Sequence, residues 1–184
     1  YSFTGSITPS CAAGGFTYMD EDALGVLLTI KAHASSGGTA STTDPVVSRY
    51  TTGYTNLASV TISGDNDGPA VAISRLSSPT FPTMPNSALW SSGQWVINDT
   101  YAFSKLLVSP DGPYDSFKLK AAIADPDGST FFSATNETGT TRIRYGQLRM
   151  SNVYGSELMS LPVPLEARYW NGSYYVTNTR DSCT

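Results

Sequence analysis

The chain has 184 residues, enough for one larger domain or for two lobes of about 90 residues each. Only 14% of the residues are charged, whereas Thr, Ser, Gly and Tyr are abundant, a balance that favours short β-strands and turns over helices. The net charge is −4 and the basic residues are scattered, so we expect no nucleic-acid binding. No apolar run is long enough to span a membrane, and we expect this segment not to insert into one.

Alternation of apolar and polar residues predicts the strands of the first half, because successive side chains of a strand point to opposite faces. The strongest alternation places Leu24, Val26, Leu28, Ile30 and Ala32 on one face. A turn rich in Gly and Asp at 64–69 separates two further strands. The predicted strands of this half are 16–19, 24–32, 57–62 and 70–76.

Three prolines within 77–88 mark a connector rather than a strand. We therefore predict an N-terminal lobe at 1–78, a Pro-rich connector at 79–88 and a C-terminal lobe at 89–184. The predicted strands of the second lobe are 89–97, 100–108, 114–124, 141–150, 161–170 and 173–178. Short strands at regular spacing predict an all-β fold, an antiparallel β-sandwich of immunoglobulin-like type.

The run 144–172 reads as a strand, a tight turn at 154–157 and a second strand. Pro162 and Pro164 lack N–H groups on the same side of that second strand, so we expect it to begin at a sheet edge.

Cys11 and Cys183 are the only cysteines, one near each end of the chain. In an exported protein an isolated pair is usually a disulfide, and the low-charge composition suits export. Two buried free thiols, or partners in segments outside this chain, remain the alternatives.

Motifs for catalysis are missing from the sequence. It has no G-x-S-x-G, H-E-x-x-H, C-x-x-C or P-loop pattern, and the sole histidine, His33, is interpreted as a satisfied structural or surface residue. We therefore predict that the chain is not an enzyme. Paired carboxylates leave no local signature, so a carbohydrate-active enzyme remains an alternative.

Two acidic turns have the pattern D-x-D-G, with carboxylates at Asp65 and Asp67 and at Asp125 and Asp127. Closely spaced carboxylates followed by a glycine suit Ca²⁺, but the Glu that closes an EF-hand loop is missing from both. Asp and Gly are also the ordinary residues of β-turns. The sequence therefore leaves open structural turns with no cofactor or a structural calcium site.

Aromatic residues are numerous, with 3 Trp and 11 Tyr. Packed inside a sandwich they would build the core, and exposed they would suit stacking on sugars or docking of a protein.

The C-terminal part carries a resemblance to a known family. The runs RIRYGQLRMSNVYGSEL from 142, LPVPLEARYWNG from 161 and VTNTRDSCT from 176 closely resemble the C-terminal region of MshQ-like proteins, bacterial proteins of the mannose-sensitive haemagglutinin (MSHA) type IV pilus. Shorter segments at 16–19, 111–113 and 125–128 are similar to the same family. The resemblance thus extends over most of the chain.

The resemblance implies a cell-surface or pilus-associated protein, exported through the periplasm, that acts as a structural or adhesive module near the pilus tip. The implied partners are pilus components, other domains of a longer chain, or surface glycans. The family supplies no catalytic residue to transfer. Gly155 and Glu157 are implied to build a fixed turn, Gly155 by a positive φ and Glu157 by accepting backbone hydrogen bonds.

Overall fold

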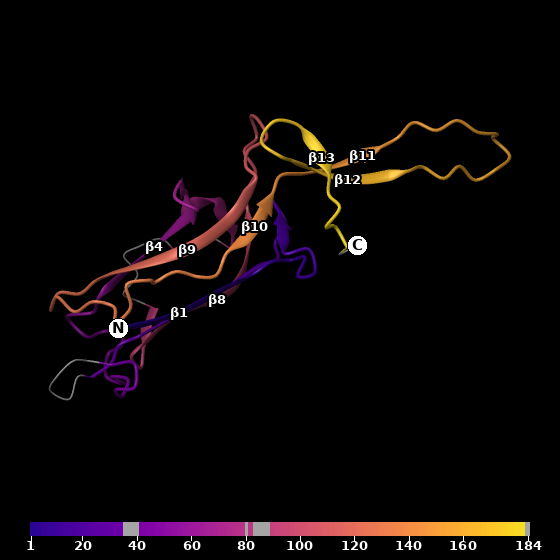
Figure 1. Cartoon of the computed structure of the whole chain (residues 1–184). Helices are drawn as coiled ribbons and strands as arrows, with labels where there is room; N and C mark the ends of the chain where they lie inside the picture. Colours follow the sequence, from indigo (N-terminus) through magenta and orange to yellow (C-terminus); the bar gives the residue numbers. More distant parts are fainter. Residues whose placement is uncertain (35–40, 80, 83–88, 183–184) are drawn as a thin grey trace.

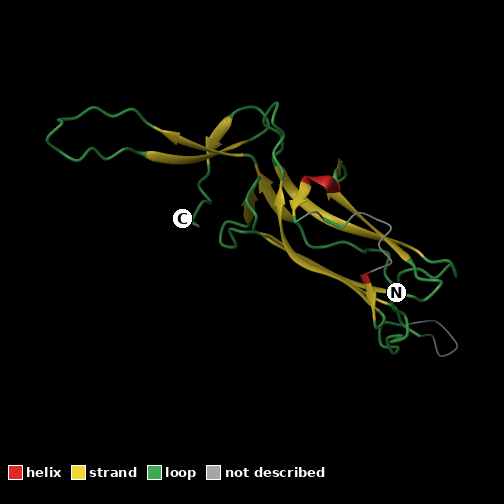
Figure 2. Ribbon diagram, turned by 180° about the vertical axis from the view of Figure 1, so that it is seen from behind, coloured by secondary structure: helices red, strands yellow, loops and turns green. Residues whose placement is uncertain are grey.

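The computed structural model of the chain describes residues 1–34, 41–79, 81–82 and 89–182. Two larger sheets face one another as a sandwich, and a smaller sheet projects from one end of it (Figures 1 and 2). Helical structure in the described ranges is limited to short 3-10 turns such as η1 (Ile73–Arg75), and no helix there is long and apolar enough to cross a membrane. The predicted all-β sandwich is confirmed.

The first sheet has the strand with the predicted apolar face 24–32 in its interior. Its order is β1 (Ser2–Thr8), β3 (Leu24–Lys31), β8 (Gln94–Phe103) and β6 (Leu76–Ser78), and β7 (Trp90–Ser91) also pairs with β8. All of these pairs are antiparallel. In β3 every second side chain is buried, and the predicted apolar face from Leu24 to Ala32 is confirmed as core.

The second sheet contains one pairing that the sequence did not predict. Its order is β2 (Phe16–Tyr18), β10 (Thr141–Arg144), β9 (Tyr114–Ala124), β4 (Ser59–Asn66) and β5 (Ala70–Val71). β2 runs parallel to β10, whereas the other neighbours are antiparallel. A parallel pair needs a long connection between its strands, and more than one hundred residues separate these two.

Large aromatic side chains fill the space between the two sheets. Trp90, Trp95, Phe103 and Phe117 are all at most 1% exposed, and Trp90 Nε1 donates a hydrogen bond to the carbonyl oxygen of Ala58 at 2.8 Å. Burying one such side chain contributes about 1.5–3 kcal/mol. These aromatics are core residues rather than an exposed platform.

The predicted division into lobes 1–78 and 89–184 is corrected by the strand pairing. β8 pairs with β3 from Lys31↔Gln94 to Leu24↔Tyr101, and the whole of β4 pairs with β9. Both predicted lobes therefore contribute strands to the same two sheets and side chains to one core. In the predicted connector 79–88, residues 80 and 83–88 lie outside the described residues, and Phe81 is buried at 1% exposure. Periodicity located many of the strands, although not β1, but it carries no information about which strands pair.

β8 is one continuous strand where the sequence predicted two. It runs through 98–99 and ends at Phe103, so the following residues leave the sheet. Leu107 and Val108 are each 98% exposed, and Leu106 is 47% exposed.

The small third sheet follows the sandwich in sequence. Its order is β11 (Gly146–Met150), β12 (Leu165–Trp170) and β13 (Tyr175–Thr177). β12 is therefore the central strand of this sheet rather than the predicted edge strand, and both prolines precede it. Residues 151–164, called the arm below, connect β11 to β12 as a long loop that extends away from the sandwich (Figures 1 and 2).

Candidate functional site

Arg144, the last residue of β10, attaches the third sheet to the sandwich. Its side chain is buried, and its guanidinium carbon lies 3.9 Å from the ring centroid of Tyr169 in β12 and 5.2 Å from that of Phe16 in β2. Its Nη1 donates a hydrogen bond to Oδ1 of Asn178 at 2.5 Å. Burial lowers the pKa of Arg144. A buried cation is costly unless it is bonded, so these contacts fix the position of the third sheet.

Tyr18 continues this network into the C-terminal segment. Its hydroxyl accepts a hydrogen bond from Nδ2 of Asn178 at 2.6 Å and donates one to Oδ2 of Asp181 at 2.9 Å. Burial raises the pKa of Tyr18 to about 12, so the hydroxyl keeps its proton at neutral pH. The residues after β13 are thereby bonded to the edge strand of the second sheet.

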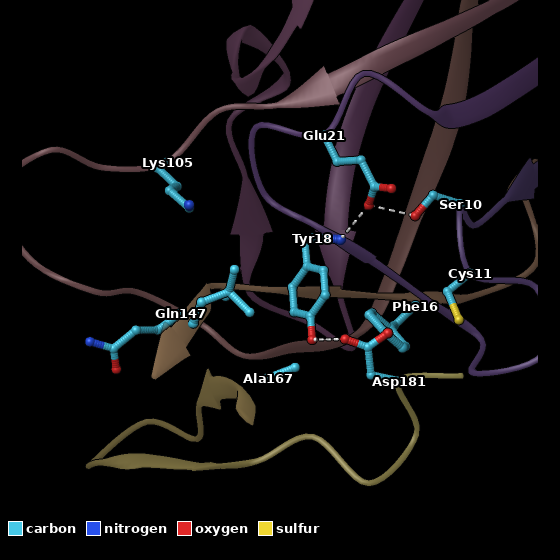
Figure 3. Close-up of a pocket in the computed structure, with 11 residues that line it drawn as sticks. Ser10, Cys11, Phe16, Tyr18, Glu21, Lys105, Gln147, Ala167 and Asp181 are labelled. Carbon is cyan, nitrogen blue, oxygen red and sulfur yellow. Dashed lines mark hydrogen bonds between the residues drawn. The ribbon is translucent and has the colours of Figure 1, made fainter. Parts of the chain in front are cut away.

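A cavity of about 500 Å³ lies beside this junction (Figure 3). Its apolar lining comes from Phe16 and Tyr18 on the sandwich and from Leu148 and Ala167 on the third sheet. This cavity is called the junction cavity below.

The charged groups of the junction cavity differ in how they are bonded. Oε2 of Glu21 accepts hydrogen bonds from Ser10 Oγ at 2.6 Å and from the Tyr18 backbone N–H at 3.1 Å (Figure 3). Lys105 is the only basic residue in the described lining. Its Nζ lies 3.9 Å from Oδ2 of Asp20 and 5.2 Å from the ring centroid of Tyr145. Glu21 is thus held by short hydrogen bonds, whereas the ion pair of the Lys105 ammonium with Asp20, among the described residues, is longer.

A second cavity, of about 510 Å³, lies at the other end of the sandwich. β9 and β10 are antiparallel neighbours, so their last residues lie at opposite ends of the sheet. Asp125, which lines this cavity, follows the end of β9, and Arg144 is the end of β10. The cavity and the junction therefore lie at opposite ends of the sandwich. Its aromatic lining residues are Tyr1, Tyr50, Tyr54, Phe131 and Phe132. It is called the aromatic cavity below.

Hydrogen bonds order one wall of the aromatic cavity. The Tyr1 hydroxyl donates to Oδ2 of Asp125 at 2.7 Å and lies 2.8 Å from the Tyr50 hydroxyl, and burial raises the pKa of Tyr1. Tyr54 is 52% exposed and its ring can be reached from solvent. The cavity therefore combines a solvent-facing aromatic ring with carboxylates and hydroxyl groups.

His33 lines the aromatic cavity, but both of its ring nitrogens are bonded. Nδ1 lies 2.7 Å from the carbonyl oxygen of Asp44, and Nε2 lies 2.8 Å from Ser2 Oγ. Because a carbonyl oxygen can only accept, Nδ1 donates to Asp44, and in the neutral ring Nε2 then accepts from the serine hydroxyl. This arrangement fits the interpretation of His33 as a structural residue.

The four predicted calcium ligands do not come together. The pairing of Ser59 with Ala124 and of Asn66 with Phe117 places the two D-x-D-G turns at opposite ends of the β4–β9 pair. One turn contains Asp65 and Asp67, and the other contains Asp125 and Asp127. Each turn must therefore be judged by its own contacts.

Within its turn, Asp65 is held by lysine and by the backbone. Its Oδ2 accepts a hydrogen bond from Nζ of Lys120 at 2.9 Å, which lowers the pKa of Asp65, and its Oδ1 accepts from the Gly68 N–H at 3.2 Å. In the other turn Oδ1 of Asp125 accepts from the Asp127 N–H at 3.0 Å. Structural turns account for these bonds.

Within the described residues no group of three or more His, Cys, Asp or Glu is placed to hold a metal ion. Calcium binding by the single turns stays a prediction.

Cys11 is buried at the edge of the junction cavity. Its sulfur lies 4.0 Å from the carbonyl oxygen of Arg180, three residues before Cys183 in the sequence. Cys183 lies outside the described residues, so its pairing with Cys11 stays a prediction. The contact with Arg180 shows that the segment around Cys11 and the C-terminal segment lie side by side.

The predicted tight turn at 154–157 is corrected. The connection is the long arm 151–164, and Gly155 does not have a positive φ. The hydrogen bonds of the turn within the arm are accepted by Ser156. The N–H of Leu158 donates to Ser156 Oγ at 3.3 Å, and the N–H of Met159 donates to the Ser156 carbonyl at 3.2 Å. The roles assigned to Gly155 and Glu157 therefore do not describe this turn.

Large apolar side chains are exposed along the whole arm. The exposed fractions are Tyr154 94%, Leu158 89%, Met159 74%, Val163 50% and Leu161 45%. Leu148, Met150 and Leu165, at the base of the arm, are also exposed, each by more than 60%. Soluble proteins rarely expose such a continuous apolar surface unless it contacts a partner.

Sequence reasoning missed Arg144, Tyr18 and Lys105 as residues of the site. A signal for Arg144 exists, because neither face of the run 142–150 is purely apolar. A positively charged residue in a strand that must be half-buried suggests a structural contact. Nothing local in the sequence distinguishes Lys105 from other lysines.

Comparisons with known proteins divide the chain where the structure does. Residues 2–144 match the family model described as DUF6701, third domain, and residues 144–184 match DUF6701, fourth domain. No curated protein and no solved structure matches the chain. The boundary between the two matches falls at Arg144, where the sandwich ends and the third sheet begins. The chain therefore belongs to the DUF6701 family, with the sandwich as its third domain and the projecting sheet and arm within its fourth.

Proposed function

We propose that the chain is a non-enzymatic extracellular module of a type IV (MSHA-like) pilus-associated surface protein. It serves as a structural or adhesive scaffold or stalk near the pilus tip, and its arm is the contact surface for the next component. The resemblance of residues 142–184 to MshQ-like proteins supports the association with a pilus. The low content of charged residues and the two cysteines support export through the periplasm.

The observation that carries this proposal is the exposed arm on a firmly attached base. Buried contacts of Arg144 with Tyr169 and Asn178 hold the third sheet on the sandwich. The arm beyond this sheet exposes Tyr154 and Leu158 almost completely. An apolar surface presented away from the body suits docking onto another protein, because burying it there removes it from water.

The test measures retention on sheared pili in a bacterium that encodes the protein. The double substitution Leu158→Asp with Met159→Asp changes two exposed side chains of the arm, so it should leave the fold intact and remove the protein from the pilus fraction. Tyr174→Asp is the matched control, because Tyr174 is 63% exposed and lies in the same domain outside the arm. Absence of the wild-type protein from pili, or equal retention of the arm variant, refutes the proposal.

A binding domain for surface glycans is the second candidate, and the aromatic cavity favours it. The exposed ring of Tyr54 offers a stacking surface, and Asp125 and Asp127 offer hydrogen-bond acceptors for sugar hydroxyls. Binding on a glycan array that Tyr54→Ala abolishes, at an unchanged melting temperature, would support this candidate. Binding that Tyr54→Ala leaves intact would rule out this cavity as the site.

A further inference from the structure

We infer that the aromatic cavity binds a small organic cation, namely a quaternary ammonium group such as that of choline. This inference goes beyond the proposed function, because it concerns the far end of the sandwich rather than the arm. It also differs from the glycan candidate, because it assigns the cavity a charged ligand rather than a neutral sugar. Three observations carry it: the arrangement of the rings, the charge of the lining, and the bonding of its polar groups.

The rings of the cavity come from separate segments and are tilted against one another. Tyr1 precedes β1, whereas Tyr50 and Tyr54 lie between β3 and β4, and a further ring comes from Phe132 between β9 and β10. The ring centroid of Tyr50 lies 6.1 Å from that of Tyr1 at an interplanar angle of 63°, and 5.9 Å from that of Tyr54 at 44°. Rings that are not parallel can surround a single ligand from more than one side. Such a cage attracts a cation, because the face of an aromatic ring is negative.

The lining of the aromatic cavity is negatively charged. Asp125 and Asp127 contribute two carboxylates, and the described lining contains no Lys or Arg. The N-terminal amine of Tyr1 opposes them and donates a hydrogen bond to the Thr130 carbonyl oxygen at 3.0 Å. Burial lowers the pKa of this amine by more than the nearby Asp125 raises it, which weakens its positive charge. A cationic ligand therefore complements the two carboxylates, whereas an anion would be repelled.

The hydrogen-bonding groups of one wall are used within the protein. The Tyr1 hydroxyl donates to Oδ2 of Asp125, and Oδ1 of the same carboxylate accepts from the Asp127 N–H. The Tyr50 hydroxyl lies 2.8 Å from that of Tyr1 and accepts from the Ala58 N–H. A primary ammonium must replace its hydrogen bonds to water, and this wall has little capacity left for them. A quaternary ammonium has no N–H group, so negative charge and ring faces suffice to bind it.

Isothermal titration calorimetry of the 184-residue chain tests the inference with two ligands of nearly the same shape. Choline carries the quaternary ammonium, whereas a neutral carbon replaces the nitrogen in 3,3-dimethylbutan-1-ol. Choline should bind about tenfold more tightly than this neutral analogue, and also more tightly than ethanolamine, which carries a primary ammonium. No binding of choline, equal binding of the neutral analogue, or tighter binding of ethanolamine overturns the inference.

Variants locate the binding in this cavity. Tyr54→Ala removes an exposed ring of the lining and should weaken choline binding about three- to thirtyfold, whereas Tyr54→Phe keeps the ring and should bind choline normally. Asp127→Asn removes one negative charge and should weaken binding of choline but not of the neutral analogue. Tyr174→Ala is the control, because Tyr174 is also exposed but lies outside the cavity. Melting temperatures should stay unchanged in all of these variants, because each alters an exposed side chain. Unchanged choline binding in Tyr54→Ala, or an equal loss in Tyr174→Ala, overturns the inference.

Vesicles of phosphatidylcholine distinguish the two sources of the group. Sedimentation of the chain with these vesicles, but not with phosphatidylglycerol vesicles, assigns the ligand to a lipid headgroup, whereas binding of free choline alone assigns it to a soluble ion. Both results support the inference. They are independent of the pilus test: a chain that binds choline but is absent from pili keeps this site and loses the proposed function, and a chain retained on pili that does not bind choline does the opposite.

Discussion

Replacing Arg144 by Met should loosen the third sheet while the sandwich stays folded. The substitution keeps a long side chain but removes the charge-assisted hydrogen bond to Asn178, worth about 1.5–3 kcal/mol, and the contact with the Tyr169 ring, worth roughly 0.5–2 kcal/mol. It also removes a buried cation whose Nε has no hydrogen-bond partner in the described residues, which offsets part of the loss. We expect a net cost of about 2–3 kcal/mol for attachment of this sheet.

Hydrogen exchange resolves where this loss occurs. The backbone N–H of Trp170 donates to Tyr145, and that of Asn178 donates to Ala167, so both amides report on the third sheet. Their protection should fall about 30- to 140-fold, because each 1.4 kcal/mol is tenfold. The amide of Leu119, in the centre of the second sheet, should keep its protection.

Arg142→Met is the matched control, two residues earlier in the same strand. Its Nε lies 3.8 Å from Oδ1 of Asp115, and both side chains are more than one third exposed. Exposed pairs of this kind contribute little, so we expect a change within about 0.5 kcal/mol. Equal effects of the two substitutions, or an even loss of protection across the sandwich, would refute the assignment of Arg144 as the attachment point.

Three further predictions concern the turns, the cavity and the acidic loops. Gly64→Ala should lower the melting temperature, because a Cβ there meets the Val71 carbonyl oxygen at 2.6 Å, whereas Gly155→Ala should not, because its Cβ meets only the movable end of the Leu161 side chain; equal shifts would contradict this. Because burial raises the pKa of Tyr18 to about 12, its neutral form stabilises the fold fully below its ordinary pKa near 10, and this contribution should be lost as the pH rises through 12. Denaturant unfolding of Tyr18→Phe should show a smaller loss over that window, and an identical pH profile would contradict it. Added Ca²⁺ or EDTA should leave the melting temperature unchanged if the D-x-D-G segments are structural turns, and stabilisation by Ca²⁺ would instead support an ion site.

Local pattern predicted several strands of the sandwich, although not β1. The alternation from Leu24 to Ala32 marks its buried face because side chains of a strand alternate strictly between two sides. The predicted strand 114–124 agrees with β9 at both ends. The low content of charged residues and the frequent turn residues likewise predicted an all-β fold, since these are properties of single segments.

Pairing and attachment depended on residues far apart in the sequence. β8 completes a sheet with β3, and β2 joins β10 across more than one hundred residues, so the predicted lobes merge into one sandwich. The turn containing Asp65 and the turn containing Asp125 look alike in sequence, yet strand register places them at opposite ends of the sheet.

The sequence by itself thus determined many of the extended segments and the apolar face of the strongest one, because both follow from the order of neighbouring residues, but it missed β1 at the start of the chain. Only the tertiary structure decided that Arg144 joins two sheets, that Lys105 borders a cavity and that the arm leaves its apolar side chains exposed. The physical reason is that burial and contact depend on which distant strands pair, and the free energy of that pairing is shared by the whole core.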